Sequence, residues 1–373
     1  MRIPLSAPDI TEAEVAAVSE VLRSGRLSLG PKLEEFEASI AQYCDAVHAV
    51  GVSSGTAGLH LCVRALGISE GHEVILPSFT FVAAANVLRY ERAIPVFVDI
   101  DPVTLNLDPT AVEAAITPRT RAILAVHTFG VPADLTRLLT IAHRHKLLLI
   151  EDACEAIGAE YREKKIGTFG DAGVFAFYPN KQITTAEGGV VVTNDPGLAR
   201  KIKALRNHGR AANAEWLQHS EVGYNYRLSE LHSALGAEQM KRIHSILRRR
   251  EEIARAYEER LADQSLLELP PRELADRKMS WFVYVVRTKE SLGSTKRDVL
   301  ASQLAERGIE TARYFVPLHL QPAYHEVFAP RRPLNVTESA GARTLALPFF
   351  NRITDDQLTE VCSALDELLP SGG

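Results

Sequence analysis

The sequence predicts an α/β fold: a mostly parallel, seven-stranded sheet covered by helices, followed by a smaller α+β domain. Short β-rich runs alternate with helical stretches from about residue 45 to 195. The chain has 373 residues, which is more than one ordinary hydrophobic core holds. Its composition also changes after Pro270-Pro271. We therefore expect a large domain over residues 1–244 and a small C-terminal domain over residues 245–373.

The seven predicted strands of the large sheet all lie in the large domain. In chain order they span residues 48–52, 73–76, 94–99, 122–127, 147–151, 173–177 and 189–193. Predicted helices lie between them, for example at residues 57–66, 81–90, 109–116 and 134–145. Strands separated by helices imply parallel neighbours with both faces covered. The last two strands lack an evident helix between them, so we expect a mixed edge.

The remainder of the chain predicts longer helices and the smaller domain. Residues 228–261 are rich in Leu, Ala, Glu and Arg and predict one or two long helices. Their basic run, Arg248-Arg249-Arg250, is followed directly by Glu251 and Glu252, which indicates a solvated helix face. The final third predicts a strand and two helices, at residues 281–286, 295–307 and 355–368.

Composition and charge argue against several classes of partner. Hydrophobic residues are 46% and charged residues 24%, as in ordinary globular proteins. The net charge of −5 offers no attraction to nucleic acid or to an anionic membrane. No apolar run reaches the roughly 18 residues of a membrane-spanning helix, and the N-terminus lacks an apolar core of signal-peptide length. We therefore expect a cytoplasmic protein without nucleic-acid or membrane partners.

The spacing of cysteines and histidines argues against a metal site. The four cysteines show no CxxC pair, and the 12 histidines form no HExxH-type pattern. We expect reduced thiols and no catalytic metal.

The segment Ser53-Ser54-Gly55-Thr56-Ala57 lies between a predicted strand and a predicted helix. Free N–H groups and the helix dipole at a helix start favour a phosphate. The same residues are also good helix caps, so the segment alone leaves both interpretations open.

Glu151-Asp152 ends a buried strand, and ligands of parallel sheets bind outside the carboxyl ends of the strands. Asp152 could therefore hold a metal, a ribose or a protonated ring nitrogen, or cap the next helix.

Lys181 follows another strand and is flanked by small polar residues and by Gly188-Gly189; as a single residue it could be an ordinary surface lysine. Phe79 and Phe81 also follow a strand, where an aromatic ring can stack on a planar cofactor or belong to the core.

Together these features are the parts that pyridoxal 5′-phosphate (PLP) requires. The lysine amine would form a Schiff base, the carboxylate would keep the pyridine nitrogen protonated, and the helix start would anchor the phosphate. Neither a GxxxxGK[ST] motif nor a strand-linked GxGxxG is present, which disfavours a nucleotide cofactor.

Over nearly its whole length, from residues 24–31 to 345–350, the chain resembles the DegT/StrS family of PLP-dependent sugar aminotransferases. These enzymes have the fold of aspartate aminotransferase, PLP fold type I. The motifs that carry the resemblance are at residues 151–156, 181–189 and 223–227.

The resemblance implies roles for individual residues. Lys181 matches the Schiff-base lysine, and Asp152 matches the partner of the pyridine nitrogen. The phosphate-binding turn and the stacking ring correspond to Gly55, Thr56, Ala57 and Phe81. Asn225 matches a residue that reaches the phosphate of the neighbouring subunit, which implies a homodimer with shared active sites.

Two positions depart from the family pattern. Ala176 stands where many members have a serine that contacts the phosphate, so we expect that hydroxyl contact to be missing. Glu155 stands where many have a glutamine near the 3-hydroxyl of the cofactor, so it either faces the cofactor differently or is structural.

The resemblance implies transfer of an amino group from an amino acid, expected to be glutamate, to a nucleotide-linked keto-deoxysugar. A 4-keto-6-deoxyhexose is the expected acceptor, in amino-sugar and polysaccharide biosynthesis. The freed amine of Lys181 would act as general base. Candidate substrate contacts, each of which could also be an ordinary surface or interdomain residue, are Glu187, Arg227, Arg313, Tyr314 and His319.

Three alternatives are a sugar dehydratase, a carbocycle-forming synthase of the same family, and a non-catalytic regulator that senses PLP or sugar. Related sugar 3-dehydratases replace the lysine with histidine, so Lys181 favours transamination. The joint presence of lysine, aspartate and phosphate turn disfavours a regulator.

Overall fold

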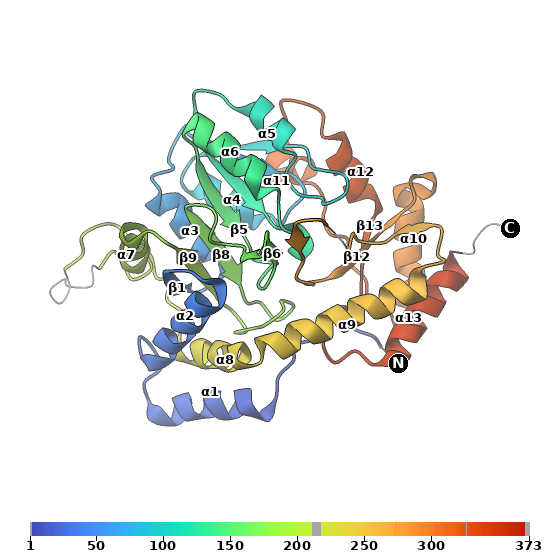
Figure 1. The fold of residues 1–373 in the computed structure, drawn as a ribbon, viewed down its shortest axis with the longest axis horizontal. Helices are drawn as coiled ribbons and strands as arrows, with labels where there is room; N and C mark the ends of the chain where they lie inside the picture. Colours follow the sequence, from blue (N-terminus) through green and yellow to red (C-terminus); the bar gives the residue numbers. More distant parts are fainter. Residues whose placement is uncertain (1, 211–217, 273, 326, 370–373) are drawn as a thin grey trace.

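A seven-stranded sheet forms the centre of the computed structural model, which describes residues 2–210, 218–272, 274–325 and 327–369 (Figure 1). The strand order is β1-β9-β8-β5-β4-β2-β3. The strands are β1 His48–Val52, β2 Glu73–Pro77, β3 Ile94–Val98, β4 Thr120–Val126, β5 Leu148–Asp152, β8 Ala172–Ala176 and β9 Gly189–Thr193. Pairs among β3, β2, β4, β5 and β8 are parallel, whereas β9 is antiparallel to both β8 and β1. The predicted mostly parallel sheet with a mixed edge is confirmed.

Side-chain alternation along the strands divides the core into two layers, one on each face of the sheet. Val74 and Leu76 of β2 pack in one apolar cluster with α3, α4 and α7, whereas Ile75 packs in the other with α2, α5, α6 and α8. The helices are α1 Glu12–Ser24, α2 Pro31–Cys44, α3 Gly55–Ala65, α4 Ala83–Tyr90, α5 Pro109–Ala115, α6 Leu135–His145, α7 Pro196–Leu205, α8 Glu230–Lys241 and α9 Ile243–Leu261.

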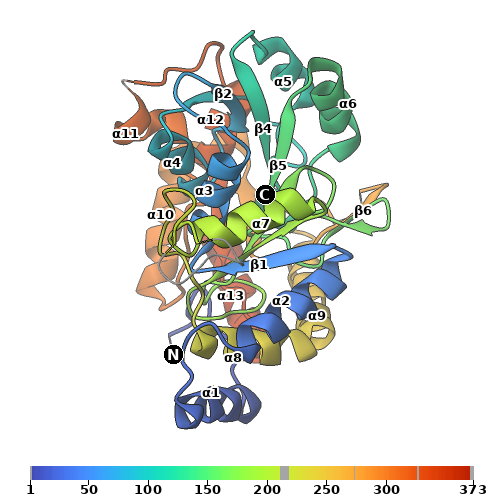
Figure 2. The ribbon, with the colours of Figure 1, turned by 90° about the vertical axis from the view of Figure 1, so that its left-hand side faces the viewer.

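Figure 2 shows α1 lying outside the sheet layers, against α8. The helical stretch predicted over residues 228–261 is two helices, which meet at Arg242.

A second, smaller sheet follows α9 in the chain. Its order is β10-β12-β13, formed by Leu267–Glu268, Tyr284–Thr288 and Thr344–Leu347. The helices α10 Gly293–Glu306, α11 Pro322–His325, α12 Asn335–Arg343 and α13 Asp355–Leu368 belong to the same part of the chain. The strand predicted at residues 281–286 begins only at Tyr284, because Trp281 and Phe282 turn inward before the sheet pairing starts.

The two parts are connected in several ways. Helix α9 runs from α8 to α13 (Figure 1), and the predicted boundary between residues 244 and 245 falls in its first turn. In a small sheet, β6 Glu160–Tyr161 lies between β11 Arg277–Lys278 and β7 Lys164–Lys165 and pairs with both. The division into two domains stays a prediction. In the described part of the chain, no helix is both long and apolar enough to cross a membrane.

The sequence predicts a solvated helix face for the basic run at residues 248–250. The structure differs in part. Arg248 is exposed, but Arg250 is only 2% exposed. Ile246, Arg250 and Ile253 are three and four residues apart, so the helical repeat places them on the same buried face of α9. The prediction was wrong for Arg250 because adjacent arginines on a helix point in different directions.

Candidate active site

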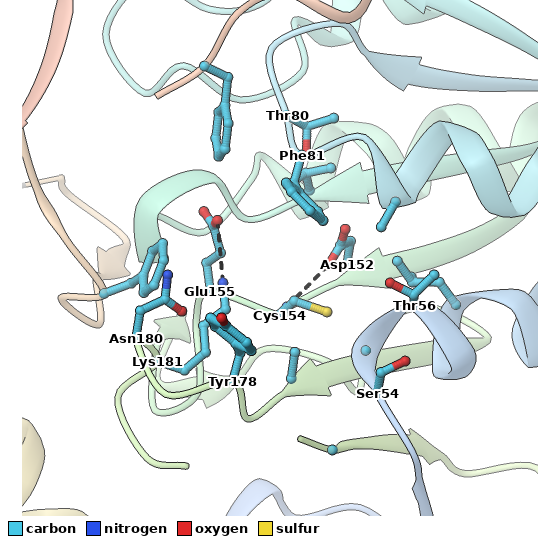
Figure 3. Close-up of a pocket in the computed structure, with 18 of the residues that line it drawn as sticks. Ser54, Thr56, Thr80, Phe81, Asp152, Cys154, Glu155, Tyr178, Asn180 and Lys181 are labelled. Atoms are coloured by element: carbon cyan, nitrogen blue, oxygen red, sulfur yellow. Dashed lines mark hydrogen bonds and ion pairs between the residues drawn. The ribbon is translucent and has the colours of Figure 1, made fainter. Parts of the chain in front are cut away.

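A cavity of about 450 Å³ opens at the carboxyl ends of β4, β5 and β8 (Figure 3). The last residues of these strands, Val126, Asp152 and Ala176, line it. The N-terminus of α3 forms a second wall, and residues near Phe282 and Tyr314 form a third. The cavity therefore lies where ligands of α/β sheets commonly bind.

The turn into α3 places the N-terminus of a helix at the cavity. Ser54 is the N-cap, and its Oγ accepts a hydrogen bond of 3.0 Å from the N–H of Ala57. Gly55 and Thr56 line the cavity, and N–H groups in the first turn of a helix have no intrahelical acceptor. A Cβ on Gly55 would lie 2.6 Å from Cβ of Ala176, so only glycine lets α3 approach β8 this closely. Helix capping and exposure of N–H groups to the cavity thus coexist in this turn.

Asp152 and Glu151 point to opposite faces of β5. The Glu151 carboxylate accepts hydrogen bonds from His127 Nε2 and from the N–H groups of Gly167, Phe169 and Gly170. Burial alone would raise the pKa of Glu151, but these bonds, above all that from His127, hold it below its ordinary value. Glu151 is therefore committed to the protein interior.

Asp152 faces the cavity, and its Oδ1 accepts a hydrogen bond of 3.2 Å from the N–H of Cys154. The next element after Asp152 is a strand, β6, so Asp152 caps no helix. Its carboxylate, which also contacts Cys154, faces the cavity and can serve a ligand there.

Lys181 lies in the loop between β8 and β9, with its amine inside the cavity. Its Nζ is 3.6 Å from Oε1 of Glu155 and 3.9 Å from the ring centroid of Phe282. The side chain is only 13% exposed, which excludes the surface-lysine interpretation. Figure 3 shows the pairing of Lys181 with Glu155 across the cavity.

Glu155 is a cavity carboxylate. Its Oε2 accepts a hydrogen bond of 2.9 Å from the N–H of Phe129, while Oε1 faces Lys181. Burial raises the pKa of Glu155, and the positive charge of Lys181 opposes that rise. The position that departs from the family pattern therefore faces the lysine amine.

The two aromatic residues after β2 have different environments. Phe79 is fully buried in the core, whereas Phe81 is 62% exposed and lines the cavity near Asp152 (Figure 3). Phe81 can therefore cover a planar ligand, and the core interpretation applies only to Phe79.

Among the predicted substrate contacts, Glu187 and Tyr314 line the cavity, and three others do not. Arg227 donates to Asn207 Oδ1 at 3.0 Å, and Arg313 pairs with Asp298. His319 is 4% exposed; its two ring nitrogens face Ser78 Oγ at 2.7 Å and Glu338 at 3.3 Å. The structure thus brings Glu187 and Tyr314 to Lys181, but not Arg227, Arg313 or His319.

Asn225 also lies outside the lining of the chain's own cavity. It is exposed, and its backbone pairs with that of Asn207. Its neighbours Tyr224 and Tyr226 anchor the segment through hydrogen bonds to Glu91, at 3.0 Å, and to His60, at 3.1 Å. Asn225 is therefore presented outward from a fixed segment.

Several residues that line the cavity were not predicted from the sequence. Tyr178 and Asn180 immediately precede Lys181, and this adjacency was a signal that they share its cavity. The side chain of Asn180 hydrogen-bonds the hydroxyl of Tyr314, and its Oδ1 is buried without a partner among the described residues. Phe282 and Phe315 come from distant parts of the chain, and no local pattern marks them.

The donor set fits PLP. A buried amine, a carboxylate at a strand end, helix-start N–H groups and an exposed ring surround one cavity. The unpartnered Oδ1 of Asn180 shows that this cavity has an unused acceptor for a polar ligand.

Comparisons of the sequence and of the structure with known proteins agree on one family. The model of the DegT/DnrJ/EryC1/StrS aminotransferase family matches residues 8–366. GDP-perosamine synthase of Caulobacter vibrioides is 41% identical over 371 residues, covering 99% of this chain and 98% of that protein. Among solved structures, S. venezuelae DesV in complex with a ketimine intermediate has a TM-score of 0.92 and 39% identity, covering 100% of both chains. The PLP-form of Spr1654 from Streptococcus pneumoniae has a TM-score of 0.94 and 27% identity, covering 99% of this chain and 98% of that one.

Proposed function

Because the chain belongs to the DegT/DnrJ/EryC1/StrS aminotransferase family and is an aminotransferase, we propose that it transfers an amino group to a nucleotide-linked keto-deoxysugar with PLP as cofactor. The observation that carries this proposal is the buried amine of Lys181, held in one cavity with Asp152 and the α3 turn. The expected donor is glutamate, and the expected acceptor is a 4-keto-6-deoxyhexose. The name of the GDP-perosamine synthase relative supports a nucleotide-linked sugar.

When bound, PLP supplies an electron sink for the carbon that loses its proton. Lys181 would hold the cofactor through Nζ and, when free, move a proton as general base. The Asp152 carboxylate would hold a proton on the ring nitrogen. The N–H groups of Gly55 and Thr56 would bind the phosphate, and Ala176 would add no hydroxyl to them.

The remaining cavity residues would orient the ligands. Glu155 would lie near the 3-hydroxyl and hold a proton beside Nζ of Lys181. Phe81 would cover one face of the ring and exclude water from it. Glu187 and Tyr314 are the predicted substrate contacts that lie in the cavity.

We also propose a homodimer in which Asn225 completes the site of the partner. The exposed position of Asn225, outside its own cavity, supports this arrangement. The hydrogen bonds of Tyr224 and Tyr226 would hold Asn225 in place when the partner approaches.

The test is to incubate purified protein with PLP, glutamate and a panel of nucleotide-linked keto-sugars, and to follow product mass. Exchange of a ketone for an amine supports the proposal, whereas loss of water would identify a dehydratase. A cyclised product would identify a synthase, and binding without turnover a regulator.

Lys181→Ala is expected to lose the visible absorption band of the lysine-bound cofactor and to lower turnover by roughly 10²–10⁴-fold, because the general base is removed. Lys203→Ala, at a half-exposed lysine outside the cavity, should keep both properties. An unchanged band and full turnover in Lys181→Ala would refute the central role of Lys181.

A further inference from the structure

Helix α9 carries a buried cation in the middle of an apolar stripe. Arg250 is 2% exposed and shares its helix face with Ile246, Ile253 and Tyr257. Within the described residues its terminal nitrogens contact main-chain carbonyls and no carboxylate, and its Nε is buried without an acceptor. Burial lowers the pKa of Arg250 to about 10, which still leaves the group charged at neutral pH. A buried cation with no carboxylate in contact costs desolvation energy, which the charge of Asp9 and the hydrogen bonds to main-chain carbonyls offset.

The partners of Arg250 are main-chain carbonyls at the cavity. One terminal nitrogen donates to the carbonyl of Lys181 at 3.2 Å, and the other donates to the carbonyl of Phe282 at 3.4 Å. Its guanidinium carbon also lies 5.3 Å from the ring centroid of Phe349. One planar side chain thus connects the loop that carries Lys181 with the segment that leads into the second sheet.

The two residues held by Arg250 meet again inside the cavity, where Nζ of Lys181 lies 3.9 Å from the ring centroid of Phe282. We propose that Arg250 is a positioning residue that holds the carbonyls of Lys181 and Phe282 and thereby sets the lysine amine against the Phe282 ring. Gln182 reinforces the same connection, because its Nε2 donates to the carbonyls of Glu155, at 2.7 Å, and Ser280, at 3.3 Å.

The inference rests on the proposed PLP chemistry of Lys181 and concerns the geometry of its amine. Misplacement of a reacting group by a small distance has large kinetic effects. Loss of the Arg250 contacts should therefore slow attachment of PLP to Lys181. It should also expose the amine to small reagents, because the ring that shields it is no longer held.

The test compares Arg250→Met, which keeps most of the volume but no donor, with Arg250→Lys, which keeps the charge but cannot reach both carbonyls with a planar fork. The matched control is Arg297→Met. Arg297 is also buried and donates to two main-chain carbonyls, those of Gly341 and Thr344; unlike Arg250 it also pairs with a carboxylate, that of Asp298, and it lies outside the cavity lining.

Two readouts are measured on PLP-free protein. The first is the rate at which added PLP produces the visible band, expected to fall by about tenfold or more in Arg250→Met and less in Arg250→Lys. The second is reductive methylation with formaldehyde and cyanoborohydride, followed by peptide mass spectrometry. Lys181 should be methylated faster in Arg250→Met while other lysines keep their rates, and Arg297→Met should match the wild type in both readouts.

Wild-type rates in both readouts for both Arg250 variants would overturn the inference. If Arg250→Met does not unfold cooperatively, Arg250→Lys decides the outcome by the same criteria. A wild-type protein that forms no band with PLP would instead overturn the proposed function, while the methylation rates would still decide the role of Arg250.

Discussion

The amine of Lys181 lies between two unlike neighbours, the Glu155 carboxylate at 3.6 Å and the Phe282 ring at 3.9 Å. Tyr314 shares this environment, since burial and the charge of Glu155 raise the pKa of its hydroxyl. Asp152 also acts on Glu155, and its charge adds to the rise in the pKa of Glu155. The protonation of Glu155 therefore depends on the charges of its cavity neighbours.

Glu155→Gln is expected to change how stability depends on pH. The pKa of Glu155 is raised above its ordinary value of 4.5, so the folded state binds its proton more tightly than the unfolded chain does. The contribution of Glu155 to the free energy of unfolding is fully present below pH 4.5 and is lost as pH rises through the raised pKa. Between the two pKa values this loss is about 1.4 kcal/mol for each pH unit. The glutamine variant lacks this loss.

The measurement is chemical denaturation of PLP-free protein between about pH 4 and 8. Glu155→Gln should gain stability relative to the wild type as pH rises, and Glu259→Gln, at an exposed position of α9, should follow the wild type. Parallel curves for the wild type and Glu155→Gln would show that Glu155 does not titrate as described.

The sequence predicted individual site residues correctly where they lie at the end of a predicted strand or just after it. Asp152 and Lys181 stand beside strands that periodicity reveals, and both lie in the cavity. The surroundings of Lys181 were not predictable. Phe282 and Arg250 contact it only in the folded chain, and no sequence motif around either residue indicates this contact. His319 shows the converse: it was predicted to contact the substrate, but it is buried and its ring nitrogens contact Ser78 and Glu338 instead.

At the scale of elements, the start of α3 depends on glycines at its contacts with the sheet. A Cβ on Gly189 of β9 would lie 2.7 Å from the carbonyl of Ser54, and a Cβ on Gly55 would lie 2.9 Å from Sγ of Cys154. These distances are too short for real contacts, so α3 and the two strands would have to separate.

Gly55→Ala is therefore expected to weaken PLP binding about tenfold or more, because relieving the contact with Ala176 displaces the turn that is proposed to bind the phosphate. Gly197→Ala is the matched control, since the nearest atom there belongs to the exposed side chain of Asp195 and not to a neighbouring strand. Equilibrium titration of PLP into the PLP-free proteins measures the effect. Equal dissociation constants for Gly55→Ala and the wild type would contradict it.

The elements themselves differ in how visible they were in the sequence. The strands of the large sheet were found because each is a buried apolar run between turns. Helix α1 went unnamed although Thr11 and Glu14 form a capping box at its start, which is a readable signal. The two-residue strands β6, β7 and β11 could not be found, because pairing of distant segments creates them.

At the scale of the whole molecule, residues from both the large-sheet part and the second part of the chain line the cavity. Residues at the carboxyl ends of the large sheet form one side, and Phe282, Tyr314 and Phe315 form the other. Sequence patterns predicted both parts but not their contact, in which Phe79 and Phe129 pack with Phe282 from far along the chain. In the proposed dimer, the site of each subunit also needs Asn225 of the other subunit.

Mixing two inactive variants tests this sharing. Lys181→Ala and Asn225→Ala should each have little activity, but mixed dimers of the two should recover about half of the wild-type value, since each has one intact site. The measurement is turnover of co-expressed, differently tagged dimers purified through both tags. The control pairs Lys181→Ala with Asp152→Ala, which leaves a defect in each site of the mixed dimer. Mixed dimers of the first pair without restored activity would contradict the shared site.

The cavity lining stretches from Ser54 to Phe315, and this span has a consequence for synthesis of the protein. A nascent chain that has completed β9 already possesses the α3 turn, Asp152 and Lys181. It still lacks Arg250, Phe282 and Tyr314, which emerge from the ribosome later. The early chain thus displays its reactive amine before the wall that shields it exists. If the chain binds PLP as proposed, capture of the cofactor in its final geometry has to await translation of the last third of the chain.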